Sequence, residues 1–173
     1  PCQSILVKTT TAGMIDIKKD NNKPFDYEIA KPLSVSVSND TYEDVTHIML
    51  NGSVGIEKIN HRNADAQMIY VPINGVNYAV AVIDNNVREV PVSFVAKTMG
   101  EYTIKLSTEN EDFDYVYLVD NYSGDMINML VDDYTFLSTT DDNADRFVLK
   151  LYDVYSVDEY LRKENFAFVN NNE

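Results

Sequence analysis

One short acidic stretch has the residue types and the spacing of a cation site. The segment from Asp141 to Asp145 reads D-D-N-A-D and places side-chain oxygens at alternate positions, on Asp141, Asn143 and Asp145. Carboxylate and amide oxygens at this spacing open many calcium-binding loops. The remainder of the EF-hand pattern is missing, because Arg146 stands at the glycine position and Tyr152 at the position of the bidentate glutamate.

Two interpretations of this stretch remain open. Asp141, Asn143 and Asp145 are candidate calcium ligands, which would share a site with a carboxylate from Asp112, Asp114, Asp132 or Asp133. Alternatively, the stretch is a solvated acidic loop between two strands. The sequence therefore predicts no cofactor other than calcium, and calcium only under the first interpretation.

Residues for catalysis are scarce. His47 and His61 are the only histidines, and a catalytic triad or a histidine-rich zinc site would need both to converge with a third partner. The chain contains no G-x-S-x-G, H-E-x-x-H or glycine-rich phosphate-binding motif. We predict no catalytic residues and no enzymatic activity. An enzyme would require a deep pocket that holds one of these histidines beside an acid with a perturbed pKa.

The aromatic residues raise the alternative of carbohydrate binding. The chain has 12 Tyr and no Trp, so tyrosines would have to supply the sugar platform. Tyr42, Tyr122 and Tyr155 would serve if their rings are exposed. Most tyrosines fall at strand spacing, which favours packing in the core or on a sheet face.

The formal net charge is −14, and most of it lies in the second part of the chain. Residues 101–173 hold 5 Lys/Arg against 17 Asp/Glu, whereas residues 1–100 hold 9 against 11. Such a field repels phosphate backbones and anionic lipids, which argues against nucleic-acid and membrane-surface partners. No apolar run approaches the ~18 residues of a membrane span, so we predict no direct membrane insertion.

The elements that must position these side chains are predicted to be β-strands. Strand-like runs separated by Gly, Asn and Asp cover residues 101–107, 115–124, 133–138 and 146–152. Regularly spaced runs of this kind are typical of antiparallel strands in a sandwich or barrel. We predict an all-β fold, an antiparallel β-sandwich of jelly-roll or immunoglobulin-like type.

The upstream part of the chain shows the same period of two. Residues 33–38 alternate apolar side chains with serines, which predicts a half-buried strand. Asn74-Gly75 separates two further strand-like runs and supplies the two positive φ angles of a type I′ hairpin turn. Pro72 lacks an N–H, so we expect it at an edge or at a non-hydrogen-bonded position of the ladder.

We predict a single β-sandwich domain over residues 1–173, with two less regular ends. Residues 1–60 would supply the N-terminal strands. Residues 153–173 would form a C-terminal helix and strand extension, in which Ser156 and Glu159 are spaced as a capping box that begins a short helix.

Three short motifs lie in the second part of the chain: Y-L-V-D-N-Y-S-G over 117–124, D-Y-T-F over 133–136 and R-F-V-L over 146–149. Together with the strands that precede them, they resemble a β-sandwich module of secreted and outer-surface proteins of Bacteroidetes, often found near the C-terminus of large surface proteins. The similarity covers about residues 65–152. It implies a β-sandwich displayed outside the cell, with no catalytic residues.

We therefore expect a non-catalytic, acidic module that is secreted or displayed on the bacterial outer surface, with a structural, adhesive or spacer role. Its expected partners are other domains of a larger surface protein or another surface protein. The alternative is a carbohydrate- or calcium-binding module of a surface protein, for which a glycan would be a partner.

Overall fold

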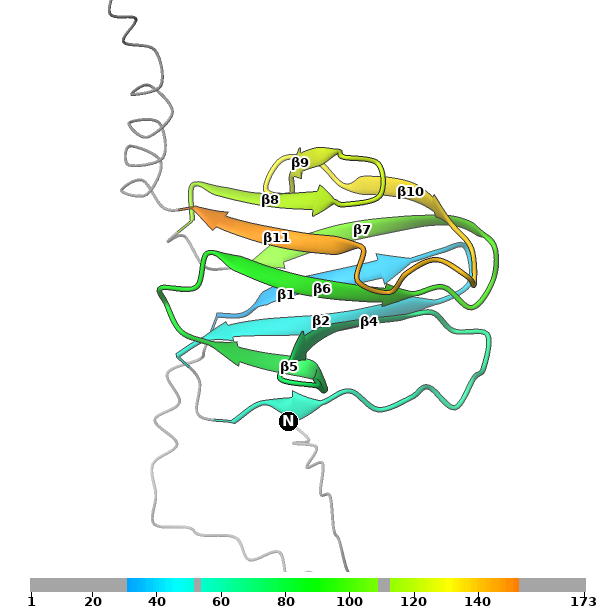
Figure 1. Cartoon of the computed structure of the whole chain (residues 1–173), viewed down its shortest axis with the longest axis horizontal. Coiled ribbons are helices and arrows are strands. Elements are labelled where there is room, and N and C mark those ends of the chain that lie inside the picture. The colour runs from blue at the N-terminus through cyan, green and yellow to red at the C-terminus, as the bar shows by residue number, and fades with distance from the viewer. Residues whose placement is uncertain (1–30, 52–53, 109–112, 153–173) are drawn as a thin grey trace, which may run out of the picture.

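The computed structural model describes residues 31–51, 54–108 and 113–152. These residues form eleven strands (Figure 1), and none of the described elements is a helix long and apolar enough to span a membrane. The predicted strands before residue 31 and the predicted extension over 153–173 lie outside the described residues. The strands are β1 Leu33–Ser38, β2 Glu43–Leu50, β3 Ile56–Glu57, β4 Met68–Ile73, β5 Val76–Ile83, β6 Glu89–Val95, β7 Gly100–Thr108, β8 Tyr115–Asp120, β9 Met126–Asn128, β10 Tyr134–Ser138 and β11 Phe147–Tyr152.

The strands share one continuous ladder that is nearly closed into a barrel (Figure 1). Its order is β10-β7-β1-β2-β5-β4-β6-β11-β8-β9, and β3 pairs with β5 off this path. The predicted all-β class is confirmed. The predicted division into two sandwich sheets is not confirmed. β4 pairs with both β5 and β6, so it joins the half made of β10, β7, β1, β2 and β5 to the half made of β6, β11, β8 and β9. The prediction of antiparallel pairing is wrong at one place: β2 and β5 run parallel, since the chain crosses over through β3 and β4 between them.

Alternation along the strands builds the core. β1 buries its three apolar side chains and leaves its serines partly exposed, as its period of two predicts. Aromatic rings from four strands meet in this core. The ring centroid of Phe94 lies 4.9 Å from Tyr102 and 5.2 Å from Phe136, and Phe136 lies 5.0 Å from Phe147. These edge-to-face contacts join β6, β7, β10 and β11, and therefore strands from both halves of the ladder.

The β4–β5 hairpin turns through Asn74-Gly75, as predicted. Asn74 has a φ of 51° and Gly75 a φ of 80°, the two left-handed conformations of a type I′ turn. The residues on either side of such a loop form a hydrogen-bonded pair. The next pair, Pro72 with Asn77, is therefore not hydrogen-bonded, and the missing N–H of Pro72 removes no bond to β5.

The ladder between β4 and β6 stops where two prolines would face each other. Tyr70 and Ser93 form the last pair between these strands. Two residues further in the same register, the next hydrogen-bonded pair would join Pro72 to Pro91. Neither proline has an N–H to donate, so the ladder ends and the strands separate.

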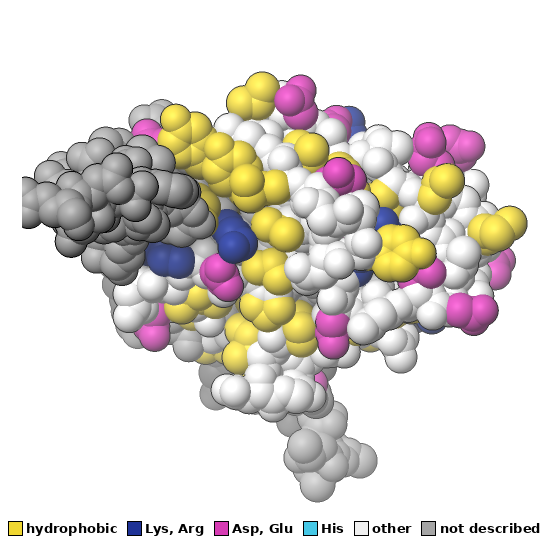
Figure 2. All heavy atoms as spheres, turned by 45° about the horizontal axis from the view of Figure 1, so that its top comes forward, with side chains coloured by type: hydrophobic (Ala, Val, Ile, Leu, Met, Phe, Trp, Pro, Cys, Tyr) yellow, Lys and Arg dark blue, Asp and Glu magenta, His cyan; other side chains and the backbone are white. Residues whose placement is uncertain are grey.

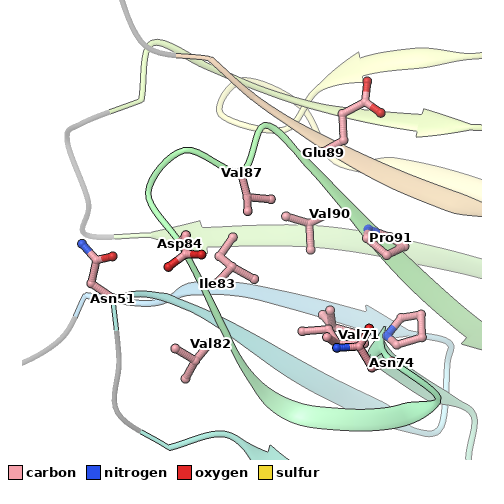
Figure 3. A pocket seen from close by; sticks show the side chains of 12 residues that line it. Asn51, Val71, Asn74, Val82, Ile83, Asp84, Val87, Glu89, Val90 and Pro91 are labelled. Carbon is pink, nitrogen blue, oxygen red and sulfur yellow. The ribbon is translucent and has the colours of Figure 1, made fainter.

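The pairing of β6 with β11 supports this assignment. The N–H of Leu151 donates to the carbonyl of Arg88 at 2.8 Å. Every second residue of β6, counted from Arg88, therefore directs its backbone groups toward β11. Pro91 lies between two such residues, so its backbone faces β4. A hollow of about 490 Å³ opens between the separated strands (Figure 3). Its walls are mainly apolar and include Val71, Pro72, Ile73, Val87, Val90 and Pro91.

Candidate functional site

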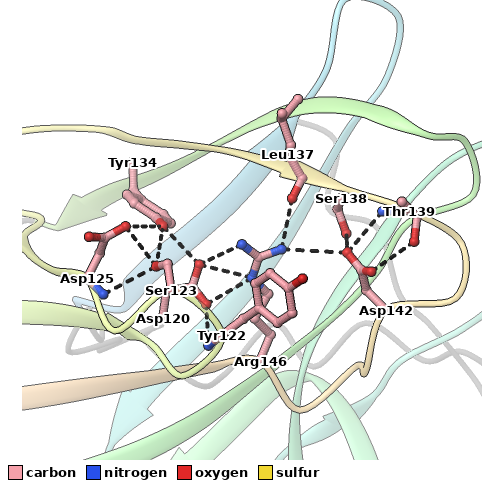
Figure 4. A network of polar contacts seen from close by, with 10 residues as sticks. All are labelled: Asp120, Tyr122, Ser123, Asp125, Tyr134, Leu137, Ser138, Thr139, Asp142 and Arg146. Carbon is pink, nitrogen blue, oxygen red and sulfur yellow. Dashed lines mark hydrogen bonds and ion pairs between the residues drawn. The ribbon is translucent and has the colours of Figure 1, made fainter.

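A dense network of polar side chains lies at the seam, where the two ends of the ladder, β10 and β8–β9, come together (Figure 4). Among the described strands, no backbone ladder joins β10 to β8 or β9. Side chains make the connection instead. We call this group the seam cluster; its members are Asp120, Ser123, Asp125, Tyr134, Asp142 and Arg146.

Arg146 is the centre of the seam cluster. Its Nε donates to Asp120 Oδ1 at 2.9 Å and its Nη2 to Oδ2 at 2.7 Å, and the two side chains are only 6% and 1% exposed. Its Nη1 donates to the backbone carbonyl of Leu137 at 3.0 Å. The rings of Phe136 and Tyr122 lie 4.6 and 5.1 Å from the guanidinium carbon, within the range of cation–π contacts. One side chain thus connects β8, β10 and β11.

Tyr134 makes the second connection across the seam. Its hydroxyl lies 2.8 Å from Asp120 Oδ2 and 3.1 Å from Asp125 Oδ2, so the two carboxylates share its single proton. Ser123 Oγ donates to Asp125 Oδ2 at 2.7 Å. The β8–β9 turn and β10 are therefore held together by a continuous set of hydrogen bonds (Figure 4).

The contacts of the seam cluster move its pKa values away from neutrality. Burial alone would raise the pKa of Asp120, but hydrogen bonds from Arg146, from the Tyr122 N–H and from Tyr134 outweigh burial and lower that pKa. Burial, followed by the neighbouring carboxylates, raises the pKa of Tyr134 to about 12. Burial opposes the charge of Arg146, yet Asp120 raises its pKa overall. At neutral pH the cluster therefore holds a carboxylate, a neutral phenol and a guanidinium.

The three candidate calcium ligands lie beside the seam cluster, in the loop between β10 and β11. Asp141, Asn143 and Asp145 line one hollow of about 310 Å³ together with Tyr122 and Arg146. In that loop, Asn143 Oδ1 accepts the N–H of Asp145 at 3.0 Å, and Asp145 Oδ1 accepts a hydrogen bond from Ser93 Oγ at 2.8 Å. Within the described residues, no three His, Cys, Asp or Glu side chains are grouped to hold a metal ion. Calcium binding here stays a prediction.

The two histidines have partners in the structure. His47 Nδ1 lies 2.8 Å from the Ser34 hydroxyl, and burial, followed by the charge of Lys58, lowers its pKa. His61 Nε2 lies 3.1 Å from Asp44 Oδ1. The same Asp44 carboxylate accepts Lys58 Nζ at 2.7 Å and a backbone N–H of β4 at 2.7 Å. Asp44 thus links β2 to β4, which no backbone ladder joins among the described strands.

No single sequence motif unites the residues of the seam cluster. Asp120, Tyr134 and Arg146 belong to the three motifs described above, and each motif is a separate stretch of the sequence. The only local signal is that a charged residue directly adjoins an apolar strand, as Asp120 ends β8 and Arg146 precedes β11. Pairing them across 26 residues requires the fold.

Comparisons with known proteins leave the function to be argued from this geometry. No protein-family model, no curated protein and no solved structure matches the chain.

Proposed function

We propose that the protein is a non-catalytic β module, secreted or displayed on the outer surface of a bacterial cell, with a structural, adhesive or spacer role. The observation that supports the non-catalytic part of this proposal is the seam cluster, whose donors and protons are used within the cluster. A general acid or base works best with a pKa near the operating pH. The contacts of Asp120 and Tyr134 shift both pKa values away from neutral pH: the pKa of Asp120 is lowered, and that of Tyr134 is raised to about 12.

The hydrogen bonding of the cluster supports the same role. The donors of Arg146 are used on Asp120 and on the Leu137 carbonyl, and the hydroxyl of Tyr134 is used on the carboxylates. Buried polar groups that satisfy one another make a structure rigid and specify its register. A module that carries load or presents a surface needs such closure at the seam, where no backbone ladder joins the described strands β10 and β8–β9.

The finer fold and the partners belong to the same proposal. We infer that the barrel is flattened into a sandwich-like, two-layer body, in which the inward side chains of β1, β6, β7 and β11 share one core. Its partners are other domains of a larger surface protein or another surface protein. The net charge of −14 supports partners other than nucleic acids and anionic membranes.

Protease shaving of intact cells tests this proposal. A membrane-impermeant protease added to cells of the native host should remove the protein, or the secreted form should be found in the medium. A cytoplasmic marker protein in the same sample should stay intact. If the protein is degraded only after lysis and is missing from the medium, the proposed location is wrong and the adhesive role fails with it.

Calcium binding is a second candidate, favoured by the placement of Asp141, Asn143 and Asp145 around one hollow. A ligand that binds only the folded state raises its stability. Calcium chloride should therefore raise the melting temperature more than magnesium chloride at equal ionic strength, and the D141N/D145N variant should lose the difference. An equal response to both salts would remove this candidate.

A further inference from the structure

The outer faces of the two halves of the barrel differ in chemistry. Where β1, β7 and β10 pair, the outward positions are mostly polar and include Ser34, Ser36, Thr103, Lys105, Ser107 and Thr135, with the exposed Leu137 as the apolar exception. Where β8 and β11 pair, the outward positions are Tyr115, Tyr117, Val119, Val148, Lys150 and Tyr152. An antiparallel sheet with one solvated face normally turns polar side chains to that face. The β8–β11 face departs from this rule.

Three tyrosines form a row on this face, which we call the tyrosine row: Tyr115, Tyr117 and Tyr152. The rings of Tyr115 and Tyr117 stack with centroids 5.8 Å apart and planes 10° apart. Tyr152 meets Tyr117 edge-on at 6.1 Å. Figure 2, which brings the upper strands of Figure 1 forward, shows hydrophobic side chains gathered in this part of the surface. Tyr115 is the most exposed of the three rings, at 40%, whereas Tyr117 and Tyr152 are half-buried.

The size of this surface favours a small ligand over a protein partner. Apart from Tyr115, the outward side chains of β8 and β11 are half-buried. Even with Met126 of β9, which pairs with Val119 and is 58% exposed, they expose less than the ~800 Å² per partner of a standard protein interface. A second copy of the chain is further disfavoured because each copy carries a charge of −14. The area suits an elongated ligand a few rings long.

The polar groups around the row match a carbohydrate. Asn128 of β9 stands opposite Tyr117, and Lys150 of β11 lies beside it with its Nζ 3.1 Å from Glu89 Oε1. An apolar ring surface with amide, ammonium and carboxylate groups at its border combines a stacking face with hydrogen-bonding partners. The C–H faces of a sugar ring pack on aromatic rings while its hydroxyls bond to such groups.

We propose that the tyrosine row is a binding site for a neutral oligosaccharide, with Tyr115 as the stacking ring and Asn128, Lys150 and Glu89 as hydroxyl partners. The surplus of acidic residues in this part of the chain disfavours uronic-acid and sulfated glycans. A neutral oligosaccharide would be the ligand in the adhesive role proposed above. The inference rests on that proposed function only for its biological setting. Binding itself is measured on the isolated chain, so its failure is distinguishable from a failure of the shaving experiment.

The test is a titration of the full chain, labelled with ¹³C in the tyrosine rings, with cellohexaose, linear mannohexaose and hexagalacturonate. A neutral hexasaccharide should shift the ring signals of Tyr115, Tyr117 and Tyr152 and leave those of Tyr42 and Tyr78 in place. Tyr115→Ala should weaken that binding by about five- to tenfold, as expected for the loss of one aromatic contact. Tyr115→Phe, which keeps the ring, should change it by less than about twofold.

Met99→Ala is the matched control, since Met99 is 82% exposed in the turn before β7, and it should leave binding unchanged. The assignment is overturned if neither neutral hexasaccharide shifts the row, if hexagalacturonate binds more tightly than both, or if Tyr115→Ala binds as the parent does. Concentration-dependent dimerisation that Tyr115→Ala abolishes would also overturn it, because the face would then be an interface between copies.

Discussion

At the scale of single residues, the balance of charge and burial at Arg146 matters most. An ion pair removed from water pays a large desolvation cost, which only good geometry and further hydrogen bonds offset. Arg146 meets both conditions, with a two-point contact to Asp120, a bond to the Leu137 carbonyl and a ring of Phe136 beside the guanidinium. Removing one partner leaves the other buried without its counter-ion.

We predict that Arg146→Met lowers the free energy of unfolding by about 3–5 kcal/mol, the usual cost of breaking a buried pair on one side. Urea denaturation followed by tyrosine fluorescence measures the loss. Lys105→Met is the control, because Lys105 and Asp133 form a 2.7 Å pair whose side chains are 55% and 49% exposed. That variant should unfold at the urea concentration of the parent. Equal losses in the two variants would show that the Asp120 pair contributes nothing beyond a surface contact.

At the scale of elements, the chain uses local backbone chemistry to begin and to end strand pairing. A glycine with positive φ begins the β4–β5 pairing, and two prolines end the β4–β6 pairing. Substitutions at the two places should therefore have different effects. The turn depends on a particular backbone conformation, whereas the ladder depends on an N–H donor at every second residue.

Gly75→Ala should destabilise the protein by about 1–2 kcal/mol, the cost of placing an L-residue in the left-handed region. Steric contact makes no contribution, since a Cβ at Gly75, with its φ of +80°, would meet nothing within 4 Å. Gly100→Ala is the matched control: a Cβ there also meets nothing within 4 Å, and Gly100 has no positive φ. Thermal unfolding of both variants separates backbone strain from crowding, and similar losses would contradict the assignment.

Pro91→Val should extend the β4–β6 ladder by one hydrogen bond. The new N–H at position 91 would point at the carbonyl of Pro72, which the register places opposite it. Amide hydrogen exchange measures the result, and we expect the amide of residue 91 to exchange slowly, as amides of paired strands do. Pro72→Val tests the reciprocal bond. Exchange at solvent-like rates in both variants would mean that something other than proline separates the strands.

At the scale of the whole molecule, the seam cluster makes stability depend on pH at both ends of the range. The pKa values of Asp120 and Asp142 are lowered in the folded state, so their contribution is complete above the unfolded value of 3.8 and is lost as pH falls below it. The pKa of Tyr134 is raised to about 12, so its contribution is complete below pH 10 and is lost between pH 10 and about 12.

We therefore predict a plateau of stability between about pH 5 and pH 9, with a loss on each side, measured as the urea midpoint against pH. Tyr134→Phe should lower the plateau, because the bond to Asp120 is lost, and should flatten the alkaline side. Tyr122→Phe, at an 81% exposed ring, is the control and should keep the parent profile. An unchanged alkaline slope in Tyr134→Phe would place the titrating group elsewhere.

The part of the fold that could be predicted from the sequence is the part set by neighbouring residues. The alternation over residues 33–38 predicts β1, and Asn74-Gly75 predicts its hairpin turn. Spacing alone predicts the candidate cation ligands Asp141, Asn143 and Asp145, which line one hollow, and calcium binding there stays a prediction. Spacing does not reveal the tyrosine row, because Tyr115, Tyr117 and Tyr152 have the pattern of ordinary strand residues until their common face is known.

Local sequence pattern is enough to predict an all-β fold and the position of single turns, because period and turn chemistry act over a few residues. Only the tertiary structure decided how the ladder closes: that Arg146 reaches Asp120, that β2 lies parallel to β5, and that Pro72 comes opposite Pro91. The reason is register. Shifting a strand by one residue exchanges its two faces, and long-range pairing selects among such registers by packing the common core.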